Sequence, residues 1–215
     1  VSDADRKSSY QGTYIDGLLN GICKVYEPGK TFEGEFIDGY LVDGTMIWTS
    51  DRTQTVSFKG RVAGDITEGV REWNYRDGSK KEVQTGMFID GLLDGQGLDL
   101  TDIPAGKDML TRAGMTLPEF SNSSAIVIME GRFDDGNFVE GKMTYSDGSW
   151  YEGRFTAVGL VQGTMRCTME DGAVYQGACA DGVPHGTGEL YRADGSVFKG
   201  EFEYGAPVQV KAPAR

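Results

Sequence analysis

The feature that most constrains this sequence is a short motif, aromatic-x-Gly-x-aromatic, that recurs along the chain. Complete copies are centred on Gly12, Gly34, Gly153 and Gly200, and related glycines stand at Gly60, Gly86, Gly131 and Gly177. Successive members lie about 23 residues apart, with one interval of twice that length. Composition alone would produce about 0.4 complete copies in a chain of this length. The chain is therefore a tandem repeat.

The spacing within the motif assigns its side chains to the two faces of a strand. Side chains in a strand alternate faces with period two, so both rings share one face and the glycine lies between them. Turn pairs such as Asp16-Gly17 follow each motif, and a second strand with apolar residues on the same face comes next. Positions beside the anchor glycine are polar, as in Glu33 and Glu35. Each repeat is predicted to be a β-hairpin with one covered face and one wet face.

The predicted fold class is all-β: an elongated, single-layer, twisted antiparallel sheet of about fourteen short strands, with one hairpin per repeat. We expect a flexible N-terminal segment (1–9), repeats 1 to 4 (10–97), an irregular insert or degenerate repeat (98–128), repeats 5 to 7 with the start of a terminal half-repeat (129–204), and a C-terminal tail (205–215). Pro207 and Pro213 in the tail cannot donate to a ladder, so they would blunt the last edge strand.

The insert is predicted from a break in the pattern. From Gly95 to Leu100 the apolar residues fall one place out of phase, which turns the faces of the strand over. Residues 107–113 are predicted to form a short helix that ends at Gly114. Such a segment either carries function or serves as packing and linker, and both interpretations stay open. Its candidate contact residues are Met109, Leu110, Arg112 and Phe120.

Composition narrows the classes of partner. The chain has 215 residues, of which 39% are hydrophobic and 25% charged, and its formal net charge is −12. This charge repels phosphate backbones and argues against nucleic acid and against direct binding to anionic membranes, whereas a basic protein fits better. No apolar window is long enough to span a bilayer. Cytoplasmic localisation is favoured, but export stays open because the sequence begins at Val1 without methionine.

The sequence holds no strong signal for a catalytic, cofactor or metal site. Gly29-Lys30-Thr31 resembles the end of a phosphate-binding loop, but that loop requires glycine where Lys24 stands. The three cysteines, Cys23, Cys167 and Cys179, are predicted to be core residues. The turn aspartates recur once per repeat, about 10 Å apart, which is too far for one calcium ion. We expect no enzyme activity, no cofactor and no metal.

These features resemble MORN repeats (membrane occupation and recognition nexus). The match is best from Tyr175 to Gly195, which contains the aromatic-x-Gly strand, the Asp181-Gly182 turn and the His185-Gly186 start of the second strand. Gln84 and Met129 depart from the pattern at the first aromatic position, and only His185 keeps the histidine. The resemblance implies protein–protein interaction, self-association, or an accessory role beside an enzyme domain.

The ring-lined face is the predicted partner-binding groove, although packing within the repeat also explains the rings. Its candidate residues are Tyr14, Phe36, Trp48, Trp73, Phe88, Phe133, Tyr145, Phe155 and Tyr175. The leading hypothesis is a non-enzymatic scaffold that binds a basic or helical protein, with self-association through a terminal repeat as a further possibility. The alternatives are a membrane- or phosphoinositide-associated tether, and an enzyme or enzyme accessory module in which the insert forms part of a site.

Overall fold

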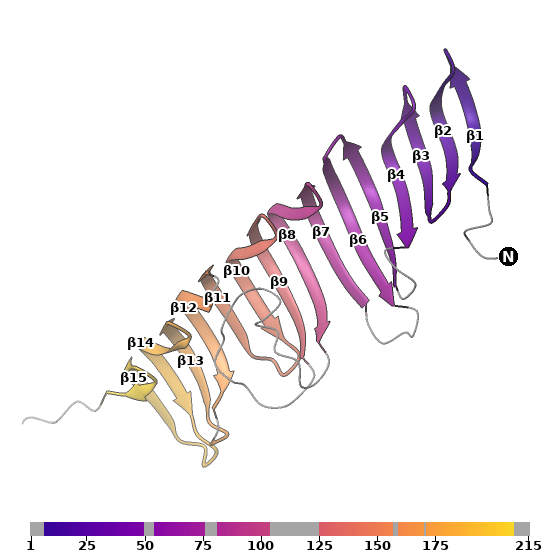
Figure 1. Ribbon diagram of the computed structural model, residues 1–215. Helices are drawn as coiled ribbons and strands as arrows, with labels where there is room; N and C mark the ends of the chain where they lie inside the picture. The colour runs from indigo at the N-terminus through magenta and orange to yellow at the C-terminus, as the bar shows by residue number, and fades with distance from the viewer. Residues whose placement is uncertain are drawn as a thin grey trace, which may run out of the picture. The chain divides into compact units, whose positions relative to one another are not determined.

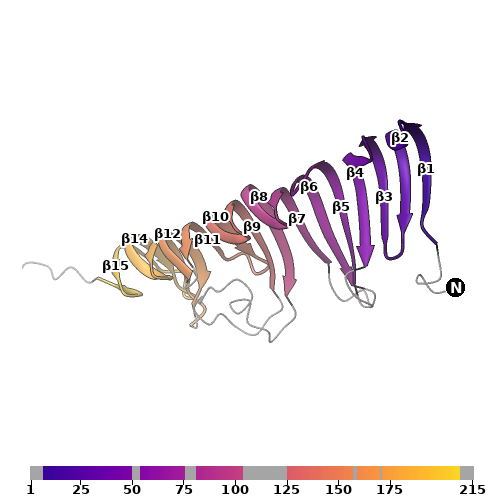
Figure 2. The same ribbon diagram turned by 45° about the horizontal axis from the view of Figure 1, so that its top comes forward.

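The computed structural model describes residues 7–49, 54–75, 81–103, 125–156, 159–169 and 171–208. Within these ranges the chain is all-β, without helices, and each strand follows its neighbour in chain order (Figure 1 and Figure 2). The chain divides into two compact units. Unit 1 comprises residues up to Asp102 together with Phe133–Gly136, and unit 2 comprises the remainder. The predicted all-β architecture of tandem antiparallel hairpins is confirmed.

The described residues form sixteen strands, whereas the sequence predicted about fourteen. The difference arises because the terminal half-repeat continues into a last short hairpin. The first eight strands are β1 (Ser9–Ile15), β2 (Leu18–Glu27), β3 (Lys30–Ile37), β4 (Tyr40–Thr49), β5 (Gln54–Ala63), β6 (Ile66–Tyr75), β7 (Lys81–Ile89) and β8 (Leu92–Ile103). The others are β9 (Ala125–Asp134), β10 (Asn137–Tyr145), β11 (Trp150–Thr156), β12 (Gly159–Thr168), β13 (Val174–Ala180), β14 (Val183–Tyr191), β15 (Val197–Glu203) and β16 (Ala206–Pro207).

Three of the predicted segment boundaries fall inside strands, the first of them because β1 starts at Ser9. β8 continues to Ile103 and β9 starts at Ala125, so the ends of the segment 98–128 are strand. The segment predicted as a tail contains β16, in which Pro207 pairs with Phe202 at the last strand of unit 2. The predicted helix at 107–113 lies outside the described residues.

The Asp-Gly pairs form the tight turns that the sequence predicts. Asp16 and Gly17 have φ values of 51° and 83°, and Asp38 and Gly39 have values of 50° and 87°. Positive φ at both central residues is the signature of a type I′ turn, whose twist matches that of the flanking strands. The same conformation occurs at Asp90, Asp135 and Asp181 and the glycine after each.

A row of glycines crosses the strands of each unit. In unit 1 the facing pairs run without interruption from β3 to β8: Gly34, Gly44, Gly60, Gly69, Gly86 and Gly97. In unit 2 Gly141 faces Gly153 and Gly153 faces Gly163. A second row, displaced along the strands, joins Gly177, Gly188 and Gly200. We call these rows the glycine ladders.

The ladders leave no space for side chains. A Cβ added to Gly34 would lie 2.6 Å from Gly44 Cα and would overlap the carbonyl oxygen of Asp43. Gly34 also has a φ of 157°, which L side chains rarely adopt. Cysteine continues the row at two places: Cys23 faces Gly34, and Cys179 faces Gly163. The anchor glycines of the motif are thus required by the close approach of neighbouring strands.

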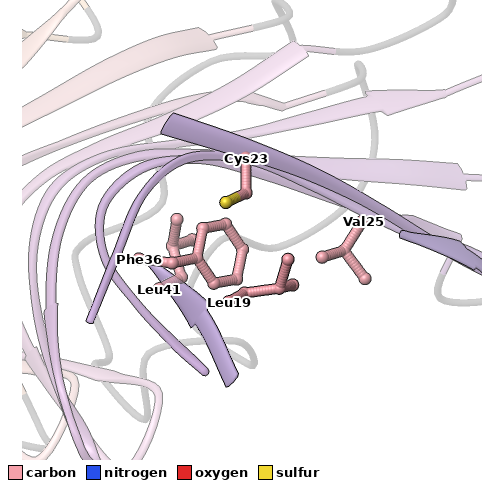
Figure 3. Packing of buried hydrophobic residues seen from close by; sticks show 5 residues of the cluster. All are labelled: Leu19, Cys23, Val25, Phe36 and Leu41. Carbon is pink, nitrogen blue, oxygen red and sulfur yellow. The ribbon is translucent and has the colours of Figure 1, made fainter. Parts of the chain in front are cut away.

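Rings and aliphatic side chains fill the covered face on both sides of the ladders. In unit 1 a buried cluster forms where β2, β3 and β4 meet, and Phe32, Met46 and Val62 pack against it. Figure 3 shows its five residues packed together: Leu19, Cys23, Val25, Phe36 and Leu41. In unit 2 four side chains on this face have no exposed surface: Met143, Tyr151, Met165 and Tyr175. Tyr175 Oη donates a hydrogen bond to Ala178 O at 2.6 Å.

Unit 2 also buries two cysteine thiols, as the sequence predicted for core cysteines. Cys167 is 4% exposed and Cys179 is 3% exposed. Burial, assisted by the Asp147 carboxylate, raises the pKa of Cys167 to about 11. The pKa of Cys179 is also raised to about 11, mainly by burial and further by Cys167. Both thiols are therefore neutral at physiological pH.

Replacement of a ladder glycine is expected to destabilise unit 1 strongly. Gly34→Ala forces β3 and β4 apart, and we expect the free energy of unfolding to fall by about 3 kcal/mol or more. Gly29→Ala is the matched control because Gly29 has a positive φ of 78° but no heavy atom within 4 Å of an added Cβ. It should cost only about 1 kcal/mol. Equal losses in urea unfolding followed by circular dichroism would contradict the steric role of the ladder.

Unit 2 is expected to lose stability as the pH rises from about 9 towards 11. In the unfolded chain the thiols ionise near their ordinary pKa of 9.0, whereas in the folded chain they stay protonated to about 11. The unfolded state therefore releases protons first, and stability falls as the pH rises through this window. Urea titrations at about pH 8 and about pH 10 measure the effect. Combining Cys167→Ala with Cys179→Ala should reduce the loss, and an equal loss in the variant would contradict the assignment to these thiols.

Candidate functional site

The predicted groove is for the most part a core. Four rings near the hairpin turns are buried, with exposures of 4% or less: Phe36, Phe88, Phe133 and Phe155. Tyr175 faces Leu190, farther from its turn, and is also buried. Trp48, Trp73 and Tyr145 are half-buried, and Tyr14 on the first strand is 52% exposed. Met109, Leu110, Arg112 and Phe120 lie outside the described residues. The groove residues thus divide into an inner set that holds the fold together and an outer set that a partner could reach.

Contacts between successive hairpins explain the burial. Phe58 of β5 meets Phe88 of β7 edge to face, with ring centroids 6.4 Å apart. In unit 2 the rings of Phe138 and Phe155 lie 4.8 Å apart, and those of Tyr175 and Phe202 lie 4.7 Å apart. Such aromatic pairs contribute about 1 kcal/mol each beyond the area that they bury. These rings are buried by packing between hairpins, so a partner protein would have to bind to other residues.

One accessible part of the covered face in unit 1 is a rung of three side chains away from the Asp-Gly turns. Trp48 faces Val56, and Val56 faces Trp73, so two half-buried indoles flank a buried valine on β4, β5 and β6. The guanidinium of Arg71 lies 5.6 Å from the ring centroid of Trp73 and 4.1 Å from that of Phe88. We call Trp48, Val56, Trp73 and Arg71 the tryptophan platform.

Arg71 occupies a place that most repeats give to an apolar residue. Its Nη1 donates a hydrogen bond to Gly91 O at 2.6 Å, in the turn of the next hairpin. Burial lowers its pKa from the ordinary value. Arginine stays protonated at physiological pH despite such a shift, so the platform combines indole surface with a positive charge.

A polar row continues from Arg71 across the next two strands. Arg71 faces Gln84, and Gln84 faces Asp99. Gln84 Nε2 donates a hydrogen bond to Asp99 Oδ2 at 2.8 Å. Gln84 stands where the motif normally has its first ring. Sequence reasoning noted that substitution but did not pair it with Asp99, although Asp99 holds the matching position on the following strand.

The phase shift predicted at the start of the insert is present in the register. Leu98 faces Thr85 and Leu100 faces Val83, so these leucines lie on the face opposite to Gln84 and Asp99. The strand nevertheless stays paired, because Gly97 still faces Gly86. The apolar side chains of β8 therefore change from the covered face to the outward face, while the glycine ladder continues through the strand.

The position before the leading glycine of the second strand braces the next turn. Asn20 Oδ1 accepts a hydrogen bond from Asp38 N at 3.2 Å, and Asp94 Oδ2 accepts one from Asp135 N at 3.4 Å. In the last complete repeat the His185 ring meets the Tyr204 ring edge to face, with ring centroids 5.6 Å apart. The sequence predicted that these residues form their own turn. In the structure Asn20 and Asp94 instead bond the turn of the following hairpin. Asparagine and aspartate accept a backbone N–H of the next turn at this position, whereas histidine makes a ring contact there.

The described residues contain no group of three or more histidine, cysteine, aspartate or glutamate side chains placed to hold a metal ion. None of their segments is a helix with the length and apolarity needed to cross a membrane.

Three segments of the chain match a known family of repeats. The sequence model of the MORN repeat matches residues 10–26, 130–150 and 175–197. Among curated proteins none matches the chain. The first matched segment covers the hairpin of β1 and β2, the second runs from within β9 through β10 to the first residue of β11, and the third covers β13 and β14 and ends at the first residue of β15. The chain therefore carries MORN repeats.

Proposed function

We propose that this chain is a non-enzymatic scaffold, a protein–protein interaction module that binds a partner protein on the tryptophan platform of unit 1. The observation that carries the proposal is the rung in which half-buried Trp48 and Trp73 flank buried Val56. MORN repeats are common in scaffold and protein-binding proteins, which supports the same class of function.

The composition of the platform suits protein recognition. Tryptophan and arginine are the residues most enriched among those that dominate binding energy at protein interfaces. Val56 is 2% exposed and provides a floor between the indoles. Because Arg71 is already held by Gly91 O and by the ring of Phe88, it loses little conformational freedom on binding. A partner segment with an apolar anchor and a carboxylate would satisfy both indole and guanidinium.

The two units differ in how much of this face remains for a partner. In unit 2 the corresponding interior holds Met143, Tyr151, Met165 and Tyr175 with no exposed surface. In unit 1 the indoles and Arg71 are only partly covered by their neighbours. We therefore assign the binding role to unit 1 and a mainly structural role to the covered face of unit 2.

Substitution of the indoles is expected to weaken partner binding. The partner is recovered from native extract by the unmodified chain, produced separately, and titrated by calorimetry. Combining Trp48→Ala with Trp73→Ala should raise Kd by about 30-fold or more, since central indoles of an interface typically contribute 2 kcal/mol or more. Trp150→Ala is the control because Trp150 lies in unit 2 on the face opposite to buried Tyr151, beneath Lys142.

The control should leave Kd within about twofold. A partner that binds the double variant as tightly as the unmodified chain would exclude the platform as the binding surface. Turnover of a substrate by the purified chain would contradict the non-enzymatic assignment.

A further inference from the structure

Unit 1 carries a second exposed surface, a row of large apolar side chains beside its hairpin turns. We call it the turn ridge. Its members have exposures between 45% and 77%: Ile15, Leu18, Ile37, Tyr40, Ile66 and Leu92. None of these residues belongs to the tryptophan platform, and packing within the sheet leaves them exposed.

The ridge lies on the face opposite to the tryptophan platform. Ile15 faces Leu18, and Ile37 faces Tyr40, so each pair flanks a two-residue turn and shares one face. Phe36 and Leu41, the chain neighbours of the second pair, are buried on the covered face. Alternation therefore places Ile37 and Tyr40 on the other side of the sheet.

Hydrogen bonds join the turns of the ridge in two pairs. Gly39 N donates to Leu19 O at 2.9 Å, and Asp90 N donates to Asp65 O at 3.1 Å. Figure 1 shows the turns that join β1 to β2, β3 to β4, β5 to β6 and β7 to β8 along one edge of unit 1. Strands lie about 4.8 Å apart, so equivalent side chains of successive hairpins are about 10 Å apart.

The turn geometry itself does not require an apolar ridge. In the last repeats of unit 2 the residues that flank the turns are Ala180 and Val183, then Glu203 and Ala206. These are short or charged side chains in the same structural positions. The large exposed residues of unit 1 thus form a local feature that the repeat can dispense with.

Carboxylates border the ridge. Glu35 and Asp43 face each other directly across β3 and β4, and Arg61 of β5 faces Asp43 from the other side, so two carboxylates share one neighbouring cation. Arg61 pairs with the exposed Glu68 at 3.8 Å. The acidic side chains on the turns and on the next outward row are exposed or half-buried: Asp16, Glu35, Asp38, Asp43, Asp65, Glu68, Asp90 and Asp94.

We propose that the turn ridge docks a basic amphipathic α-helix of a partner protein, lying across the hairpins. An α-helix rises 1.5 Å per residue, so apolar residues seven positions apart recur about every 10.5 Å, close to the hairpin spacing. Lysine and arginine beside this stripe meet the bordering carboxylates. The same charge disfavours anionic lipid and disfavours a second copy of this chain, whose net charge is −12.

A synthetic peptide tests the proposal with the full chain. The probe is a fluorescent, end-capped helix of about 22 residues with leucine at every seventh position, lysine beside the stripe and alanine elsewhere. One control peptide replaces the lysines with glutamate, and another keeps the composition but scatters the leucines. We expect the lysine peptide to bind in fluorescence anisotropy, more weakly as salt increases, and both controls to bind at least tenfold more weakly.

Variants of the chain locate the site. Combining Ile37→Ser with Tyr40→Ser should raise Kd for the lysine peptide at least tenfold. Ile47→Ser is the matched control, since Ile47 is 42% exposed but pairs with Ser57, away from the turns. Combining Asp38→Asn with Asp90→Asn keeps residues that tolerate positive φ and should flatten the salt dependence.

The remaining outcomes overturn the proposal. These are no binding at about 200 μM peptide, equal binding of the glutamate peptide, and an unchanged Kd for the Ile37 and Tyr40 variant. Self-association of the chain that this variant abolishes, measured by sedimentation, would assign the ridge to a second copy instead. The Trp48 and Trp73 variant should bind the lysine peptide with unchanged Kd. The test of the turn ridge is therefore independent of the test of the tryptophan platform.

Discussion

The structure depends on how closely its strands approach one another at the glycine ladders. Gly34 and Gly44 meet with no room for a Cβ on either, and the same holds for the pairs that follow towards β8. Side chains two residues away can then lie over the bare backbone, as the Tyr175 ring does over Gly177 and Gly188. A thin sheet thereby obtains a core without a second layer, because the rings of each strand pack over the ladder and against the next hairpin.

The same arrangement explains why the two faces and the two units have different uses. Burial of Phe36 and Phe88 consumes the rings nearest the turns, whereas Trp48 and Trp73 lie farther along the strands where the covering is thinner. In unit 2 the tyrosines and methionines complete the covering. Side chains on the outward face do not pack over the glycine ladders. They can therefore differ between unit 1 and unit 2 while the ladders stay intact.

Much of the fold could be predicted because its determinants are local. The motif spacing assigned the rings and glycines to one face, and the Asp-Gly pairs predicted turns that the φ values of Asp16 and Asp38 confirm. The groove was less predictable, since alternation gives the face of a ring but not its exposure. Phe36 and Trp48 lie on the same face of the sheet, yet the side chain of Phe36 is buried and that of Trp48 is half-buried. The ridge was missed because exposed aliphatic residues beside a turn carry no periodic signal stronger than the turn itself.

The sequence by itself determined the repeat, the hairpin, the places of the Asp-Gly turns and the side of the sheet on which the motif residues lie, because these follow from contacts within one repeat of about 23 residues. Only the tertiary structure decided which glycines face each other, which rings remain accessible, and that Arg71, Gln84 and Asp99 form one row. Those outcomes depend on register between hairpins and on how completely one hairpin covers the next. Register and coverage are properties of neighbours in space, and no single repeat encodes them.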